Sequence, residues 1–201
     1  ALEAYLRDHP QVCLGDRKEL HFFDDEARFA QPRADYADYH AHFQPGRGHR
    51  IVGEATPIYL YWTAAPARIR AYNPAMRLIV ALRNPIERAY SHWNMERDRG
   101  AESLPFGAAL RAESERAAAA RPLQDRVYSY VDRGFYTAQL QRLWQLFPRE
   151  QTLVLRQEDL RARPAEALAR VTAFLGVDPL PAVAPREVHA RPYVAPMERA
   201  D

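Results

Sequence analysis

Short apolar runs alternate along the chain with longer stretches in which apolar residues recur every three or four positions. The near-continuous apolar runs at 77–82 and 151–155 are typical of parallel strands buried on both faces, and residues 51–54 predict a shorter strand. Strands that alternate with helices predict an α/β fold with a central parallel sheet flanked by helices. Helical spacing predicts helices over residues 2–10, 66–72, 85–99, 106–120, 135–147 and 164–175, and Gly176 follows the last of them.

Composition and charge narrow the classes of function. Of the 201 residues, 47% are hydrophobic and 27% are charged, with a formal net charge of +2, which is a globular balance. The chain has no basic stripe of the kind that binds nucleic acid, and no apolar run near the roughly 20 residues that span a bilayer. Cys13 is the only cysteine, and the seven histidines show no ligand spacing, so we expect neither a disulfide nor a metal site. We expect a cytoplasmic protein, and the sequence gives no indication of its oligomeric state.

The strand-to-helix turn after the first long apolar run has features of an anion-binding site. Asn84 is a good N-cap, Pro85 occupies the first helical position, and Glu87 stands where a capping box places its acid. Amide groups at such a helix start favour an anion, and Arg83 adds a guanidinium suited to a phosphate. Ser91, two turns into the helix, adds a hydroxyl. The residues alone leave a second interpretation equally open, in which Arg83 and Ser91 only cap and solvate the helix.

A second group of ionisable residues lies near the start of the chain, at Lys18-Glu19-Leu20-His21-Phe22-Phe23-Asp24. In an extended segment, Glu19 and His21 would lie on one face. A carboxylate beside apolar rings can have a raised pKa, which suits a general base. On the residues alone, an ordinary partly buried edge is the simpler interpretation.

Both groups resemble motifs of the PAPS-dependent sulfotransferase family, whose donor is 3′-phosphoadenosine-5′-phosphosulfate (PAPS). Arg83 followed eight residues later by Ser91 matches the family's strand-turn-helix signature, and the 18–24 segment resembles the Lys-Glu-x-His-Phe-Phe-Asp motif of the heparan sulfate branch. The resemblance implies that Arg83 and Ser91 hold the 3′-phosphate of PAPS and that Glu19 is the catalytic base. It also implies that Lys18, His21 and Asp24 bind the acceptor or organise the site around it.

Two further segments resemble landmarks of the same family. The segment with Glu54 and Thr56 is similar to an acceptor-side motif, although Ala55 replaces a lysine found in many relatives. Near the end of the chain, Arg191 and Tyr193 resemble the loop that closes over PAPS. The resemblance implies acceptor contacts for the first pair and donor contacts for the second.

The resemblance also implies a P-loop-like three-layer fold, in a single domain over residues 1–201. The phosphate-cradling loop of the Lys-x-Gly-Thr-Thr type is missing from the sequence, and relatives continue with a final helix after Met197, so we expect a domain that is incomplete at both ends. The implied reaction is in-line transfer of a sulfuryl group, without a metal, to a hydroxyl or amine of a sugar, a lipid-linked precursor or a secondary metabolite.

Two other functions stay open on the sequence. A P-loop nucleotide or small-molecule kinase shares the general fold, but we find no pair of strand-end carboxylates for Mg²⁺. A non-catalytic, sulfotransferase-like binding protein fits the missing loop and Ala55, whereas the intact Glu19 argues against it.

Overall fold

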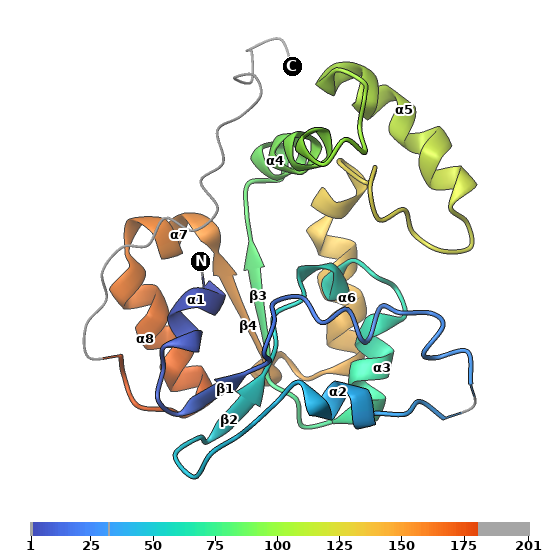
Figure 1. Ribbon diagram of the computed structural model, residues 1–201. Coiled ribbons are helices and arrows are strands. Elements are labelled where there is room, and N and C mark those ends of the chain that lie inside the picture. The colour runs from blue at the N-terminus through green and yellow to red at the C-terminus, as the bar shows by residue number, and fades with distance from the viewer. Residues whose placement is uncertain (1, 32, 181–201) are drawn as a thin grey trace. The chain divides into compact units, whose positions relative to one another are not determined.

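The computed structural model describes residues 2–31 and 33–180, which form two compact units (Figure 1). Unit 1 holds the described residues up to Leu82 and from Leu143 onward, and unit 2 holds Arg83–Arg142. The strands are β1 (Val12–Leu14), β2 (Ile51–Gly53), β3 (Leu78–Leu82) and β4 (Thr152–Arg156). The α-helices are α1 (Leu2–Arg7), α2 (Ala37–Ala41), α3 (Ala65–Tyr72), α4 (Pro85–Asp98), α5 (Phe106–Ala119), α6 (Tyr136–Leu146), α7 (Gln157–Ala162) and α8 (Pro164–Leu175). Short 3₁₀ turns are η1 (Pro57–Leu60), η2 (Asp132–Gly134) and η3 (Arg149–Gln151).

All four strands belong to unit 1, and they pair in parallel, as the alternation of strands and helices predicted. β1 pairs with β2 in the register Val12↔Ile51, and β3 pairs with β4 in the register Leu78↔Thr152. Among the described residues these are two two-stranded sheets rather than the one central sheet that we expected. Unit 1 is therefore a mixed α/β structure with small parallel sheets flanked by helices.

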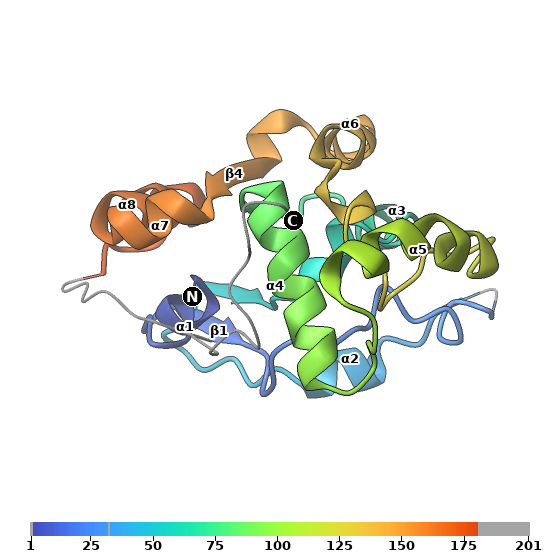
Figure 2. The same ribbon diagram turned by 90° about the horizontal axis from the view of Figure 1, so that it is seen from above.

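A shared apolar core joins the two sheets. Figure 1 places α7 and α8 on one side of the β3–β4 pair and α3 on the other side, and Figure 2 shows the same order about β4. Helix α1 packs against α7 and α8 through Tyr5, which belongs to a buried cluster with Leu160 and Leu168. Burial of these side chains is the main favourable term for such packing. The core around the sheets is formed by buried Leu6, Val12, Leu155, Val171, Leu175 and Val177, with Leu14, Ile51, Ile79 and Leu153 packed against it.

Helix α8 ends as its sequence predicts. Gly176 adopts a left-handed conformation (φ 72°), which closes the last turn at little cost for a residue without Cβ. The Arg77 guanidinium, immediately before β3, donates to the carbonyl oxygens of Phe174 at 2.9 Å and Leu175 at 2.6 Å. A cation at these carbonyls also complements the negative end of the helix dipole, so α8 is anchored to the edge of β3.

Unit 2 has an aromatic core of its own. Tyr90 and Trp93 on α4 pack against Phe106 on α5, with Tyr130 buried beside them. The ring centroids of Tyr90 and Phe106 lie 5.0 Å apart in an edge-to-face arrangement, which aromatic pairs prefer.

One expectation about the elements was wrong, and two short elements were not predicted. Only Val80 of β3 is buried and Ala81 is exposed, so this strand is not buried on both faces, because a two-stranded sheet has too little covering it. The pattern also did not predict β1 or α7 as elements, since one has three residues and the other starts directly where β4 ends.

Candidate active site

The loop that carries Glu19 and His21 has an unusual backbone. It follows β1 in unit 1, and both residues have positive φ angles, 60° for Glu19 and 54° for His21. Non-glycine residues pay roughly 1–2 kcal/mol each for this left-handed conformation, and such strain gathers at functional sites. The expectation of an extended segment was therefore wrong, and the left-handed turns rather than strand alternation bring the two side chains together.

The ionisable side chains of this loop form a chain of contacts. The Glu19 carboxylate lies 3.1 Å from Lys18 Nζ through Oε1 and 3.6 Å from His21 Nε2 through Oε2. On its other edge, His21 Nδ1 lies 3.0 Å from Asp24 Oδ2. Asp24 is fully buried, whereas the Glu19 side chain is 37% exposed. The contacts thus join a buried carboxylate to an accessible one through an imidazole, and Lys18 lies beside the accessible one.

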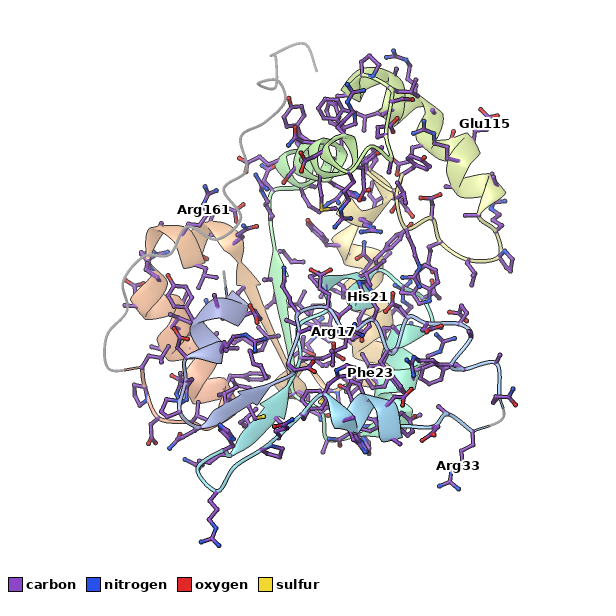
Figure 3. All side chains as sticks on the ribbon, viewed as in Figure 1. Arg17, His21, Phe23, Arg33, Glu115 and Arg161 are labelled. Carbon is purple, nitrogen blue, oxygen red and sulfur yellow. The ribbon has the colours of Figure 1, made fainter. Side chains whose placement is uncertain are left out.

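The loop rests on an aromatic cluster, and Figure 3 labels His21 and Phe23 in this part of unit 1. Phe22 and Phe23 are buried, and their rings lie 4.7 Å and 5.2 Å from the ring of Tyr39. This packing fixes Phe22 and Phe23, which lie between His21 and Asp24 in the sequence, so the core also holds the backbone that carries His21 and Asp24.

A second segment of unit 1, residues 54–59, lies against this loop. The Glu54 carboxylate accepts hydrogen bonds from Thr56 Oγ1 at 2.6 Å and from Tyr59 Oη at 3.0 Å. Burial raises the pKa of Glu54, and hydrogen bonding, first from Thr56 and Tyr59, opposes that rise by favouring the charged form.

Glu54 and Thr56 were predicted from the sequence as acceptor contacts. The structure shows that the two side chains are partners of each other, and Thr56 is buried. Their contact with an acceptor stays a prediction. Tyr59, whose hydroxyl contacts both Glu54 and the 18–24 loop, was missed, although it lies only three residues after Thr56.

The predicted helix start lies in unit 2, where α4 begins. Asn84 is the N-cap, and its side-chain oxygen accepts from the amides of Ile86 at 3.0 Å and Glu87 at 3.3 Å. This cap confirms the prediction for Asn84 but uses two of the amides that we expected an anion to occupy. Any anion here therefore depends on side chains more than on the helix amides.

Arg83 has a carboxylate partner at this helix start. Its Nε and Nη2 atoms each lie 3.2 Å from Glu87 Oε2, and the Arg83 side chain is 18% exposed. The hydroxyl of Tyr136 donates to the Arg83 carbonyl oxygen at 3.0 Å and fixes the backbone there. Ser91 lies two turns into α4 and is partly buried. Arg83 and Ser91 are thus carried by one rigid element with a fixed start.

The remaining predicted residues cannot be placed beside these groups. Arg191 and Tyr193 lie outside the described residues. Glu19 belongs to unit 1, and Arg83 and Ser91 belong to unit 2. No set of three or more His, Cys, Asp or Glu side chains in residues 2–31 and 33–180 is arranged to hold a metal ion. No helix in the same residues is long and apolar enough to cross a membrane.

Comparison with known proteins shows what the chain resembles. Residues 62–190, which include Arg83 and Ser91, match the sulfotransferase domain family. Human heparan sulfate glucosamine 3-O-sulfotransferase 3B1 is 33% identical over 178 residues, which are 88% of this chain and 43% of that protein. Human bifunctional heparan sulfate N-deacetylase/N-sulfotransferase 2 is 32% identical over 129 residues, which are 63% of this chain and 14% of that protein.

A solved structure is similar to the whole fold. The crystal structure of a sulfotransferase from Alicyclobacillus acidocaldarius superposes with a TM-score of 0.80 at 29% sequence identity, covering 99% of this chain and 81% of that one. By contrast, the chain spans less than half the length of the human 3-O-sulfotransferases 3A1 and 3B1.

Proposed function

This chain belongs to the sulfotransferase domain family, a family of enzymes, and on that premise we propose that it transfers a sulfuryl group from PAPS to an acceptor hydroxyl or amine. The observation that carries the proposal is the 18–24 loop, in which a strained backbone presents one accessible carboxylate while Asp24 is fully buried. The P-loop-like three-layer fold is part of the proposal, supported by the parallel pairing and by the likeness to a sulfotransferase structure.

We assign the role of general base to Glu19. When bound, PAPS supplies the sulfuryl group and leaves as 3′-phosphoadenosine-5′-phosphate (PAP). The Glu19 carboxylate takes the proton that the acceptor oxygen or nitrogen loses as it bonds to sulfur, which contributes roughly 10²–10⁴-fold to the rate. His21 lies 3.6 Å from Glu19 and 3.0 Å from Asp24, so it orients the Glu19 carboxylate. Asp24 in turn orients the imidazole and stabilises a positive charge on it.

The donor is assigned to the start of α4. The residues there fit the 3′-phosphate through side-chain chemistry: Arg83, just before the N-cap of α4, offers a guanidinium fork, and Ser91 on α4 offers a hydroxyl donor. The Arg83–Glu87 pair would have to open or share its fork with the phosphate. Arg191 and Tyr193 are assigned to the donor by the motif resemblance alone.

The acceptor is proposed to be a sugar. The relatives that match the chain include enzymes named for heparan sulfate glucosamine. Lys18, beside Glu19, is the cation of this loop that suits an anionic sugar, whereas Ala55 replaces the lysine of the family's acceptor motif. We therefore expect an acceptor with fewer anionic contacts than heparan sulfate itself. The cytoplasmic location and the single domain inferred from the sequence stay predictions.

The first experiment compares calorimetric binding of PAP and of ADP, which lacks the 3′-phosphate. We expect PAP to bind about 10- to 150-fold more tightly, the range of 1.5–3 kcal/mol for a hydrogen bond to a charged group. The second step follows ³⁵S transfer from labelled PAPS to a heparan sulfate oligosaccharide, a neutral glucosamine oligosaccharide and a simple alcohol, with and without EDTA.

Each result separates the candidate functions. Transfer that EDTA does not reduce supports the sulfotransferase. Equal binding of PAP and ADP, or tighter binding of ADP with Mg²⁺, contradicts it and favours a P-loop kinase. Tight PAP binding without transfer to any acceptor favours a non-catalytic binding protein.

A further inference from the structure

We propose that Tyr59 is a positioning residue for this reaction, because its hydroxyl holds the backbone of the 18–24 loop and thereby the place of Glu19 and His21. The inference rests on the proposed function. It concerns a residue that acts through the loop and makes no contact with a reacting atom.

One hydroxyl makes three hydrogen bonds. Tyr59 Oη donates to Glu54 Oε1 at 3.0 Å and accepts from the amides of Phe22 at 2.9 Å and Phe23 at 3.3 Å. A phenol has one donor and acceptor capacity for two partners, so its hydrogen-bonding groups are all used. The two amides lie between His21 and Asp24, so the hydroxyl fixes the backbone that sets their 3.0 Å contact.

A neighbouring bond extends this support along the loop. The amide of Glu19 donates to the Ala55 carbonyl oxygen at 3.2 Å. Residues 54–59 therefore receive bonds from loop amides on both sides of His21. The Glu54 carboxylate also accepts hydrogen bonds from Thr56 and Tyr59, so Glu54 and Tyr59 support the loop together. We call these two residues the bracket of the 18–24 loop.

The loop needs such a bracket because its conformation is strained. Glu19 and His21 are both left-handed, which L-residues keep only where surrounding contacts over-determine the backbone. If the bracket is lost, the chain can relax toward negative φ, and the Glu19 carboxylate then moves away from its position. A misplacement of about 1 Å can cost about 100-fold in rate.

The Tyr59 hydroxyl is suited to this task by its surroundings. Burial, with the Glu54 carboxylate beside it, raises the pKa of Tyr59, so the hydroxyl keeps the proton that it donates to Glu54. The Tyr59 ring packs edge-to-face on Phe23 at 5.6 Å between centroids. A Tyr59→Phe variant keeps this ring contact and removes only the hydroxyl.

The matched control is Tyr72→Phe. The Tyr72 ring also contacts Phe23, at 5.5 Å between centroids, so both variants change one hydroxyl in the same aromatic cluster. The Tyr72 hydroxyl, however, has a different partner, His40 Nε2 at 2.9 Å. Both variants lose one tyrosine hydroxyl, so a difference between them reports on the hydrogen bonds of Tyr59 to the loop.

The experiment measures three quantities on the wild-type chain and on both variants. These are kcat and KM for PAPS with the best sugar acceptor, calorimetric PAP affinity, and amide hydrogen exchange of the peptide that covers residues 18–24. For Tyr59→Phe we expect kcat to fall about 10- to 100-fold. KM for PAPS and PAP affinity stay unchanged, because the donor is assigned to unit 2, and exchange of the 18–24 peptide becomes faster. Tyr72→Phe stays at the wild-type value in all three.

The outcomes separate this inference from the function on which it rests. If the wild-type chain binds PAP but both variants show the same kcat and the same exchange, the positioning role of Tyr59 is wrong and the sulfotransferase stands. If amide exchange of the 18–24 peptide is unchanged in Tyr59→Phe, that result by itself refutes the positioning role of Tyr59. The exchange measurement needs no acceptor. A wild-type chain that neither binds PAP nor transfers sulfuryl overturns the proposed function, and this inference with it.

Discussion

At the scale of single residues, the two carboxylates of the 18–24 loop, Glu19 and Asp24, differ in their surroundings, and we assign them different roles for that reason. Asp24 is fully buried and contacts His21, whereas Glu19 is more than a third exposed. We predict that Glu19→Gln lowers kcat by about 10²–10⁴-fold, the range for loss of a general base. PAP affinity stays unchanged, because the substitution alters no residue of unit 2.

The control for this prediction is Glu115→Gln. Glu115 is exposed and points outward from α5 in Figure 3. Transfer of ³⁵S and calorimetric PAP binding are measured on both variants. Full activity of Glu19→Gln would show that another group takes the acceptor proton.

The sequence indicated which residues of the loop could carry chemistry but not how they contact one another. The pairing of His21 with Asp24 is a local contact over three positions. The bond from the Phe22 amide to the Tyr59 hydroxyl, by contrast, spans 37 positions. Neither periodicity nor composition carries such information, because it is decided by tertiary packing.

At the scale of elements, the best predictions came from helix ends, because their signals are local. Asn84 and Gly176 mark the ends of α4 and α8 as predicted, since a cap needs only the residues of one turn. In contrast, β1 is too short to show a period, and its pairing with β2 brings together residues 39 positions apart, Val12 and Ile51.

The start of α4 supports a prediction about donor binding. We expect Arg83→Ala to weaken PAP binding by about 1.5–3 kcal/mol, because the substitution removes a charged hydrogen-bond donor. Glu87→Gln removes the carboxylate that competes for the same guanidinium 3.2 Å away, so we expect PAP to bind more tightly by up to about 1 kcal/mol, the upper value for an exposed ion pair.

Calorimetry with PAP and ADP checks both changes. Arg111→Ala serves as the control, because Arg111 is an exposed arginine of the same unit on α5. A loss of affinity in Arg83→Ala that is the same for PAP and ADP would contradict a 3′-phosphate contact. Weaker PAP binding in Glu87→Gln would show that the Arg83–Glu87 pair organises the site and does not compete with the ligand.

At the scale of the whole molecule, the chain leaves unit 1 after Leu82 and returns to it at Leu143. The sequence did not indicate this division, because β3 runs into α4 over only two residues, with no linker composition between them. The division places the proposed base in one unit and the proposed phosphate contacts in the other. Substitutions in one unit can therefore be tested against ligand binding assigned to the other.

Unit 2 also holds titratable groups in its interior, which links its stability to pH. Burial, with the guanidinium groups of Arg133, Arg88 and Arg99 nearby, lowers the pKa of His92 to about 2. Burial raises the pKa values of Glu96 and Glu113, because it disfavours the charged carboxylate as it disfavours the charged imidazole. His92 and the two glutamates therefore change the free energy of unfolding in opposite directions as pH changes.

The sign for His92 follows from its depressed pKa in the folded state. Its contribution to stability is present above the unfolded value of 6.5 and is lost as pH falls below it, because the unfolded chain then binds a proton that the folded chain refuses. The acids act in reverse: their contribution is present below 4.5 and is lost as pH rises through their raised values. The pH profile of the wild-type protein alone therefore mixes both effects.

A difference measurement isolates the histidine. Between pH 7.5 and pH 5.0, we expect the free energy of unfolding of the wild-type protein to fall by about 2 kcal/mol more than that of His92→Gln, at about 1.36 kcal/mol per pH unit below 6.5. Urea titrations at the two pH values give this quantity. His40→Gln, which changes an exposed histidine of unit 1, should track the wild-type protein. If His92→Gln loses as much stability as the wild-type protein, His92 gains a proton in the folded state at pH 5, and its burial among arginines does not keep it neutral.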